Sequence, residues 1–225
     1  AMLSSAVVSL LVVVATVATL GYLRTSVALE ELRRVESARA ADQVDSLFTA
    51  DITAVPLIVD NLMTKQAVVE PLLLQFLSDP SISPAGHLRV RLALLPFDSA
   101  QVDPVTDILL SSGPQGLTVI RDELRAHQNV VQTFAWRELL DVSAEADRRF
   151  RAACVLADYD PSSADWNRVA EFAVDYLVQQ NPLLAGEWME CLQPVRGKLL
   201  NPLAAVLRDE SRSSAERSLG RSVLA

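Results

Sequence analysis

Residues 45–98 read DSLFTADITAVPLIVDNLMTKQAVVEPLLLQFLSDPSISPAGHLRVRLALLPFD, and residues 107–160 read DILLSSGPQGLTVIRDELRAHQNVVQTFAWRELLDVSAEADRRFRAACVLADYD. The two stretches align without a gap at a shift of 62 residues, with 14 identities in 54 positions. The identical pairs are Asp45/Asp107, Leu47/Leu109, Ile58/Ile120, Asp60/Asp122, Leu62/Leu124, Gln66/Gln128, Val68/Val130, Val69/Val131, Leu77/Leu139, Asp79/Asp141, Ser81/Ser143, Arg89/Arg151, Leu94/Leu156 and Asp98/Asp160. Unrelated helical segments rarely stay in register over such a length, so the pattern predicts an internal repeat.

Each copy of the repeat has the pattern of several short helices. In the first copy, apolar residues spaced for one helical face indicate helices over residues 44–50, 53–64, 67–78 and 85–97. Turn-forming segments such as DPSISP (79–84) and DPSSADW (160–166) separate them. Because no segment alternates polar and apolar residues between hairpin turns, the sequence predicts an all-α fold.

A third, partial copy follows the first two. LLNPLAAVLR (199–208) resembles VVEPLLLQFL (68–77) when Pro202 is aligned with Pro71, and SVLA (222–225) resembles CVLA (154–157). We therefore expect a 45–225 domain that is an α-solenoid of HEAT-like helical repeats, with units at about 45–106, 107–168 and 169–225. Because the third unit has no polar cap, we expect the natural chain to continue beyond Ala225.

A charge-free leader precedes the repeats. Residues 1–23 contain no Asp, Glu, Lys or Arg, and the 21 residues from Leu3 to Leu23 would form a helix of about 32 Å. That length spans a hydrocarbon core of about 30 Å, so we predict a transmembrane helix in residues 1–23. A cleaved signal peptide, with Ser26-Val27-Ala28 as the cleavage site, and a buried core helix are the alternatives. The opening Ala-Met suggests that residues are missing upstream.

Residues 24–44 continue as a polar segment in which arginines and acids alternate. This pattern is typical of a solvated juxtamembrane helix. Arg24, Arg33, Arg34 and Arg39 would favour a cytoplasmic location for the segment that follows the span, but the flanking residues on the other side are needed for the comparison.

Composition and motifs exclude several kinds of function. The net charge of −8 argues against nucleic-acid binding, and two cysteines do not make a disulfide scaffold. Phosphate-loop, nucleophile-elbow and zinc-protease motifs are absent from the sequence. We therefore predict no catalytic, cofactor-binding or metal-binding residue and no small-molecule substrate; a hydrolase or transferase is the least favoured hypothesis.

The cysteines and histidines are the residues whose chemistry needs separate consideration. Cys154 and Cys191 lie in helical segments rich in apolar residues, so we expect small core side chains, with a disulfide possible if the repeats face an oxidising compartment. His87 begins one predicted helix and His127 ends another. Neither has the Asp/Glu or Cys neighbours of a metal site, so we expect no ligand role for them.

Arginines and tryptophans form the remaining candidate group. We expect the arginines to cover apolar edges and pair with acids, and the tryptophans to be packing anchors between helices; partner binding is the alternative for both. These residues are Arg148, Arg149, Arg151, Trp136, Trp166 and Trp188.

Several segments together resemble one protein family. They are ADITAVPLIVDNL (50–62), LRVRLALLPFDSAQVD (88–103), LTVIRDELRAH (117–127), RFRAACVLADYDPSSADW (149–166), NPLLAGEWMECLQPVRGKLLNPLAAVLRDE (181–210) and SVLA (222–225). Over about residues 45–225 the chain resembles the helical repeat region of large bacterial membrane proteins with an N-terminal serine/threonine kinase domain. In that family a transmembrane helix precedes the HEAT-like region, and a formylglycine-generating-enzyme-like (sulfatase-modifying-factor) domain or β-propeller repeats often follow.

The resemblance implies a function without catalysis in these residues, because its motifs are helix-packing motifs and neither catalytic domain is present. It implies a membrane-anchored module that binds protein partners on its surface and serves as sensor or scaffold of a receptor-like kinase in signalling. The family arrangement places the repeats outside the cytoplasm, which conflicts with the arginines after the span. A free-standing anchored or exported adaptor with no kinase is the alternative.

Overall fold

The computed structural model describes residues 31, 34–35 and 38–224, and all regular structure in this part of the chain is helical. This confirms the predicted all-α class. The helix of residues 38–49 comes first. It is followed by η1 (Ile52–Ala54), α2 (Val55–Met63), α3 (Gln66–Leu77), α4 (Pro84–Leu94), η2 (Ser99–Gln101), α5 (Val102–Leu109), α6 (Pro114–Glu123), η3 (Leu124–His127), α7 (Gln128–Leu140), α8 (Ala146–Tyr159), α9 (Trp166–Leu177), α10 (Pro182–Leu192), η4 (Gln193–Val195), α11 (Arg196–Arg208) and α12 (Ser214–Leu224).

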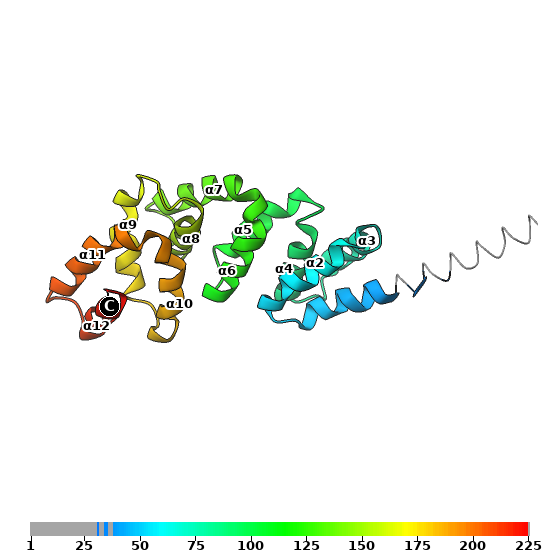
Figure 1. The fold of residues 1–225 in the computed structure, drawn as a ribbon, viewed down its shortest axis with the longest axis horizontal. Helices are drawn as coiled ribbons and strands as arrows, with labels where there is room; N and C mark the ends of the chain where they lie inside the picture. The colour runs from blue at the N-terminus through cyan, green and yellow to red at the C-terminus, as the bar shows by residue number, and fades with distance from the viewer. Residues whose placement is uncertain (1–30, 32–33, 36–37, 225) are drawn as a thin grey trace, which may run out of the picture.

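The helices follow one another along the long axis of the molecule. Figure 1 shows α2–α4 at one end, α5–α8 in the middle and α9–α12 at the other end. Helices that are close in sequence also pack together, as in the pairs α3–α4, α7–α8 and α11–α12. The fold is therefore elongated and repeat-like, with few contacts between distant segments.

The spacing of the helix starts repeats. Helices α3, α7 and α11 begin at Gln66, Gln128 and Arg196, and the helix that follows each begins 18 residues later. In both series, successive helix starts are therefore separated by 62 and then by 68 residues. The second spacing shifts the third copy by one residue relative to the predicted alignment of Pro71 with Pro202.

Burial fixes the correct register of the third copy. Val69 and Leu73 of α3 are fully buried, and the buried residues at the matching places in α11 are Leu199 and Leu203. This register pairs Pro71 with Asn201, so the predicted alignment was wrong by one position. The shared proline was misleading because Pro71 and Pro202 occupy different places in their helices, the sixth residue of α3 and the seventh of α11.

The same turn joins the last two helices of each copy. Asp79, Asp141 and Asp209 follow the last residue of the preceding helix by one or two positions. Each carboxylate accepts a hydrogen bond from the backbone N–H of the serine two residues later, at 2.8, 2.9 and 3.0 Å. Aspartate favours such local turns because its short side chain reaches its own backbone. Hydrogen bonds from the serine side chain and from this backbone N–H lower the pKa of all three carboxyl groups.

A basic residue in the following helix reinforces this turn. The ring Nε2 of His87, the fourth residue of α4, lies 3.0 Å from the carbonyl oxygen of Asp79. At the same place in α8, Arg149 Nε donates to the carbonyl of Leu139 at 3.2 Å. Carbonyls near a helix C-terminus lack intrahelical partners, and a basic side chain there supplies a hydrogen bond to one of them.

Helix α8 is the centre of the core. It packs against α6, α7, α9 and α10, and residues 152–157 are all fully buried. Most of these six side chains are small (AACVLA), which lets neighbouring helices approach from every side. Phe150 fills the space beside them, with its ring 5.0 Å from Tyr176 and 5.3 Å from Trp188.

The first helix differs from the prediction. Residues 38–49 form one continuous helix, where the sequence suggested a solvated helix ending near residue 45 and a separate short one. Ala40, Val44 and Leu47 are fully buried on one face, so this part is amphipathic and packs on the fold. Lys65 Nζ donates to Gln43 Oε1 at 2.9 Å across the same contact.

The predicted transmembrane helix of Leu3–Leu23 and the alternative cleavage site at Ser26–Ala28 lie outside the described residues. Among the helices that the structure does describe, none is both long and apolar enough to cross a membrane.

Candidate functional site

The two cysteines come together between α8 and α10. Cys154 is fully buried, and Cys191 has 5% of its surface exposed. The Cys154 and Cys191 side chains interact, and this interaction shifts the pKa of both thiols. Thr118 of α6 adds a third group, with its hydroxyl oxygen 3.7 Å from Cys191 Sγ. The expectation that both cysteines are buried core residues is confirmed, but the structure also makes them a contacting pair.

Cys191 lies on the wall of a hollow of about 450 Å³. The hollow is formed by η1, α6 and α10, and its polar lining residues are Thr53, Gln115, Thr118, Arg121, Glu187 and Glu190. Cys154 lies behind Cys191 and does not line it. The pair therefore has one thiol at a solvent-facing hollow and one thiol in the core.

The surroundings make the two thiols chemically different. The interaction with Cys154, the contact with Thr118 and the nearby Arg121 cation together lower the pKa of Cys191 to about 7, against the opposing effects of burial and Glu190. Burial raises the pKa of Cys154 well above its usual range, and the interaction with Cys191 adds to this. The thiolate is the reactive form of cysteine, so Cys191 is the more reactive of the two.

Arg121 is held in place by its own contacts. Its side chain is 11% exposed and pairs with Asp122 at 2.9 Å and with Asp158 at 3.7 Å. The Tyr159 hydroxyl donates to the Arg121 carbonyl, and burial raises the pKa of Tyr159 to about 12, so this donor keeps its proton at neutral pH. The positive charge near Cys191 is thus fixed to the scaffold.

The predicted arginine cluster is engaged within the fold. Arg148 pairs with Glu138 at 3.0 Å and Asp107 at 2.9 Å. Arg149 lies over the Phe172 ring at 3.9 Å, and Arg151 donates to the Ser112 carbonyl at 2.8 Å. The expected pairing with acids is confirmed for Arg148 and for Arg151, which pairs with Asp147 at 3.4 Å. The expected cover of an apolar surface is confirmed for Arg149, on Phe172.

The tryptophans are packing residues, as predicted. Trp166 is fully buried and Trp188 is 2% exposed. Trp136 is partly buried, meets Trp166 edge to face at 5.9 Å and donates from its ring nitrogen to Asp160 at 3.0 Å. All three join neighbouring helices.

The histidines remain apart from the cysteine pair. His87 is used in the turn before α4, and His127 ends η3. Over the part of the chain that the structure describes, no three His, Cys, Asp or Glu side chains gather as a group that could hold a metal ion.

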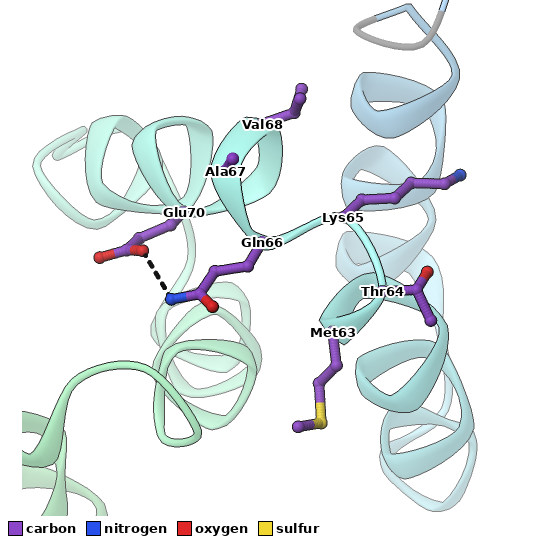
Figure 2. Close-up of a pocket in the computed structure, with 7 residues that line it drawn as sticks. All are labelled: Met63, Thr64, Lys65, Gln66, Ala67, Val68 and Glu70. Carbon is purple, nitrogen blue, oxygen red and sulfur yellow. Dashed lines mark hydrogen bonds between the residues drawn. The ribbon is translucent and has the colours of Figure 1, made fainter.

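A larger hollow, of about 610 Å³, lies at the turn between α2 and α3. Figure 2 shows that its lining side chains come from one short segment and point outward in different directions. Gln66 donates to Glu70 at 3.2 Å, and the Lys65 side chain extends away from that pair. Because these side chains diverge from a single segment, they do not bring several polar groups together around one point. This hollow is therefore a weaker candidate for a binding site than the hollow beside Cys191.

A groove of about 690 Å³ lies between α5 and α7 and is a candidate interface. Val130, which is 54% exposed, and the partly buried Phe134 form its apolar lining. The guanidinium of Arg137 lies 4.8 Å from the centre of the Phe134 ring and adds a charged edge. Aromatic and arginine side chains in a depression are typical of protein-binding surfaces.

Comparison with family models, with curated proteins and with solved structures finds no match for the chain.

Sequence reasoning raised a Cys154–Cys191 disulfide only as a conditional possibility and did not identify Thr118 or Arg121. Thr118 and Cys191 are 73 positions apart, and no local motif links them. The site depends on how α6, α8 and α10 pack, and only the tertiary structure contains that information.

Proposed function

We propose that the chain is a non-catalytic α-solenoid module that binds protein partners, and that it serves as the sensor or scaffold region of a larger membrane-anchored serine/threonine kinase. One observation carries the proposal: a pair of helices joined by the same turn occurs three times in order along an elongated fold. The three pairs are α3–α4, α7–α8 and α11–α12, and each contains the Asp-x-Ser turn.

The repeat supports a binding role because of how solenoids are built. Each unit buries its apolar stripe against its neighbours, and the stacked units present an extended surface to solvent. The groove between α5 and α7 is the best candidate on that surface, since it combines the exposed Val130 with Phe134 and Arg137.

Membrane attachment and the kinase context belong to the same proposal. The charge-free segment Leu3–Leu23 would anchor the chain as a single span, and the repeats would lie outside the cytoplasm if the family arrangement applies. The alternative is an anchored or exported adaptor that has no kinase domain. Reporter fusions on both sides of the span would establish which side the repeats occupy.

The genomic reading frame upstream of Ala1 separates the two hypotheses. The receptor-kinase proposal expects a kinase domain in the same frame. A stop codon followed by a start codon near Met2 would contradict it and favour the adaptor. Phosphotransfer and hydrolysis assays on the full chain should show no turnover, and clear turnover would contradict a non-catalytic role.

The binding surface is tested with a matched pair of valines. We expect Val130→Asp to abolish the proximity labelling of partners by the full chain in cells, because it places a charge in the apolar groove. Val142→Asp is the control, since Val142 is 83% exposed in the turn after α7 and does not line the groove. Both substitutions should leave the helical content unchanged. Equal labelling by both variants would rule out this groove as the interface.

A further inference from the structure

Cys154 and Cys191 differ in their access to solvent. Cys191 lies at the hollow that opens between η1, α6 and α10, whereas Cys154 is fully buried behind it on α8. A small reagent that enters the hollow therefore meets Cys191 first. After Cys191 is modified, Cys154 is the thiol that already lies against it.

The hollow also contains groups that suit an oxidation reaction at Cys191. The Thr118 hydroxyl oxygen lies 3.7 Å from Cys191 Sγ, and its single hydrogen is donated to the Pro114 carbonyl at 3.1 Å. Rotation of this hydroxyl away from Pro114 would let it donate to a thiolate or to a sulfur-bound oxygen. Arg121 lines the same hollow and is anchored by Asp122 and Asp158. An anchored cation near a thiol stabilises its thiolate form.

We propose that Cys191 is a peroxide-reactive thiol, and that Cys154 is its resolving partner in a reversible disulfide between α8 and α10. The inference is independent of the proposed binding function, because it depends only on the chemistry of this site.

The reaction has two steps and balances with a hydroperoxide as the oxidant. In the first, the Cys191 thiolate attacks one peroxide oxygen; an S–O bond forms, the O–O bond breaks, and the other oxygen leaves with a proton as water or an alcohol. Cys191 is then a sulfenic acid, oxidised by two electrons. In the second, Cys154 Sγ attacks Cys191 Sγ; the S–S bond forms, the S–O bond breaks, and hydroxide leaves with the Cys154 proton as water.

The new bond would act on the shape of the molecule. Helix α8 ends the second helix–turn–helix pair, and α10 precedes the third. A disulfide between them joins two neighbouring units that are otherwise held by non-covalent packing. It would therefore restrict bending at this junction and raise resistance to unfolding, because it limits the unfolded chain.

Hydrogen peroxide is the probe that tests the proposal, applied to the full chain purified in reducing buffer. We expect a disulfide-linked Cys154–Cys191 peptide in mass spectra of the oxidised wild type, the loss of two hydrogen atoms from the intact chain, a higher melting temperature, and full reversal by dithiothreitol.

Two single-cysteine variants assign the roles. In Cys154→Ala, the sulfenic acid of Cys191 cannot be resolved, so dimedone, which reacts with sulfenic acids, should label Cys191. In Cys191→Ala, Cys154 should remain unlabelled, because it is fully buried. Alanine is a conservative choice because the neighbouring residues Ala152, Ala153 and Ala157 pack in the same helix. Circular dichroism checks that both variants keep their helices.

Two results would overturn the proposal. One is the absence of the Cys154–Cys191 bond in the wild type at peroxide concentrations that oxidise the same chain in denaturant. The other is equal dimedone labelling of the two cysteines in folded single-cysteine variants, since this would show that the hollow does not direct the reaction to Cys191.

Discussion

Cys191 illustrates how neighbouring residues set the chemistry of a side chain. By composition it is one of two cysteines in a predominantly apolar chain, with no local motif around it. Its properties depend on Cys154 behind it, Thr118 beside it and the Arg121 cation in the same hollow. Cys154, one helix away and fully buried, has a pKa shifted in the opposite direction. Two chemically identical residues thus acquire different roles from their positions.

The first prediction concerns the pH dependence of Cys191. Because the pKa of this thiol is lowered to about 7, its thiolate persists to a lower pH than that of an ordinary cysteine, for which the pKa is about 8.5. We expect the rate of alkylation by iodoacetamide to rise with pH around a midpoint near 7. Mass spectrometry of the Cys191 peptide measures it. In Cys154→Ala the midpoint should move up, since the largest lowering contribution is lost. The same midpoint in the wild type and in Cys154→Ala would show that Cys154 does not lower the pKa of Cys191.

At the scale of the element, the same helix–turn–helix pair is built with different residues. The turn aspartate and serine are common to all three copies, whereas the basic residue that reaches back is His87 in the first and Arg149 in the second. In the first two copies the donor at the fourth position of the second helix is a histidine or an arginine, whereas in α12 this position is Arg217, whose Nε has no hydrogen-bond partner among the described residues. The sequence alignment contained the identical pairs Asp79/Asp141 and Ser81/Ser143 but gave no sign of the basic residue.

The second prediction concerns the turn between α7 and α8. Asp141 accepts hydrogen bonds from the backbone N–H and the hydroxyl of Ser143, at 2.9 and 2.6 Å, so Asp141→Ala should lower the melting temperature at neutral pH. The pKa of Asp141 is lowered in the folded chain, which means that its contribution is present above the unfolded pKa of about 3.9 and is lost as the pH falls through the folded value.

Thermal melts at a series of pH values measure this effect. The difference between the wild type and Asp141→Ala should be largest near neutral pH and should shrink in acid. Val142→Ala, in the same turn but without a hydrogen-bonding role for the original side chain, is the comparison. A difference that is independent of pH would show that the carboxylate charge does not contribute.

At the scale of the whole molecule, the units differ in how much of the fold depends on them. Helix α8 packs on α6, α7, α9 and α10 in the middle of the fold, while α3 packs on α2, α4 and the helix of residues 38–49, where Phe48 meets Phe76 at 5.0 Å. In repeat proteins the free energy of unfolding is approximately the sum of terms within units and terms between neighbouring units. A substitution that removes a buried contact therefore destabilises its own unit and the units that pack on it.

The third prediction compares Phe150→Ala with Leu73→Ala. Phe150 of α8 is 1% exposed and contacts Tyr176 and Trp188, so its loss should destabilise the middle and the last unit by about 3–5 kcal/mol. Leu73 of α3 is fully buried, and its truncation should cost about 2–5 kcal/mol, mainly in the first unit. Hydrogen exchange resolved by peptide measures where protection is lost. Identical exchange patterns in the two variants would indicate a single cooperative unit.

The helical class, the turn at residues 79–84 and the recurrence between residues 45–98 and 107–160 could be predicted from the sequence alone. Apolar spacing indicates which face of each helix is buried, and turn-forming residues indicate where helices end, because both depend on residues a few positions apart. The tertiary structure decided the register of the third copy, the packing of residues 38–49 on the fold and the pairing of Cys154 with Cys191. These features depend on helix–helix packing between residues far apart in sequence, and that packing is determined by the shapes of whole surfaces instead of local patterns.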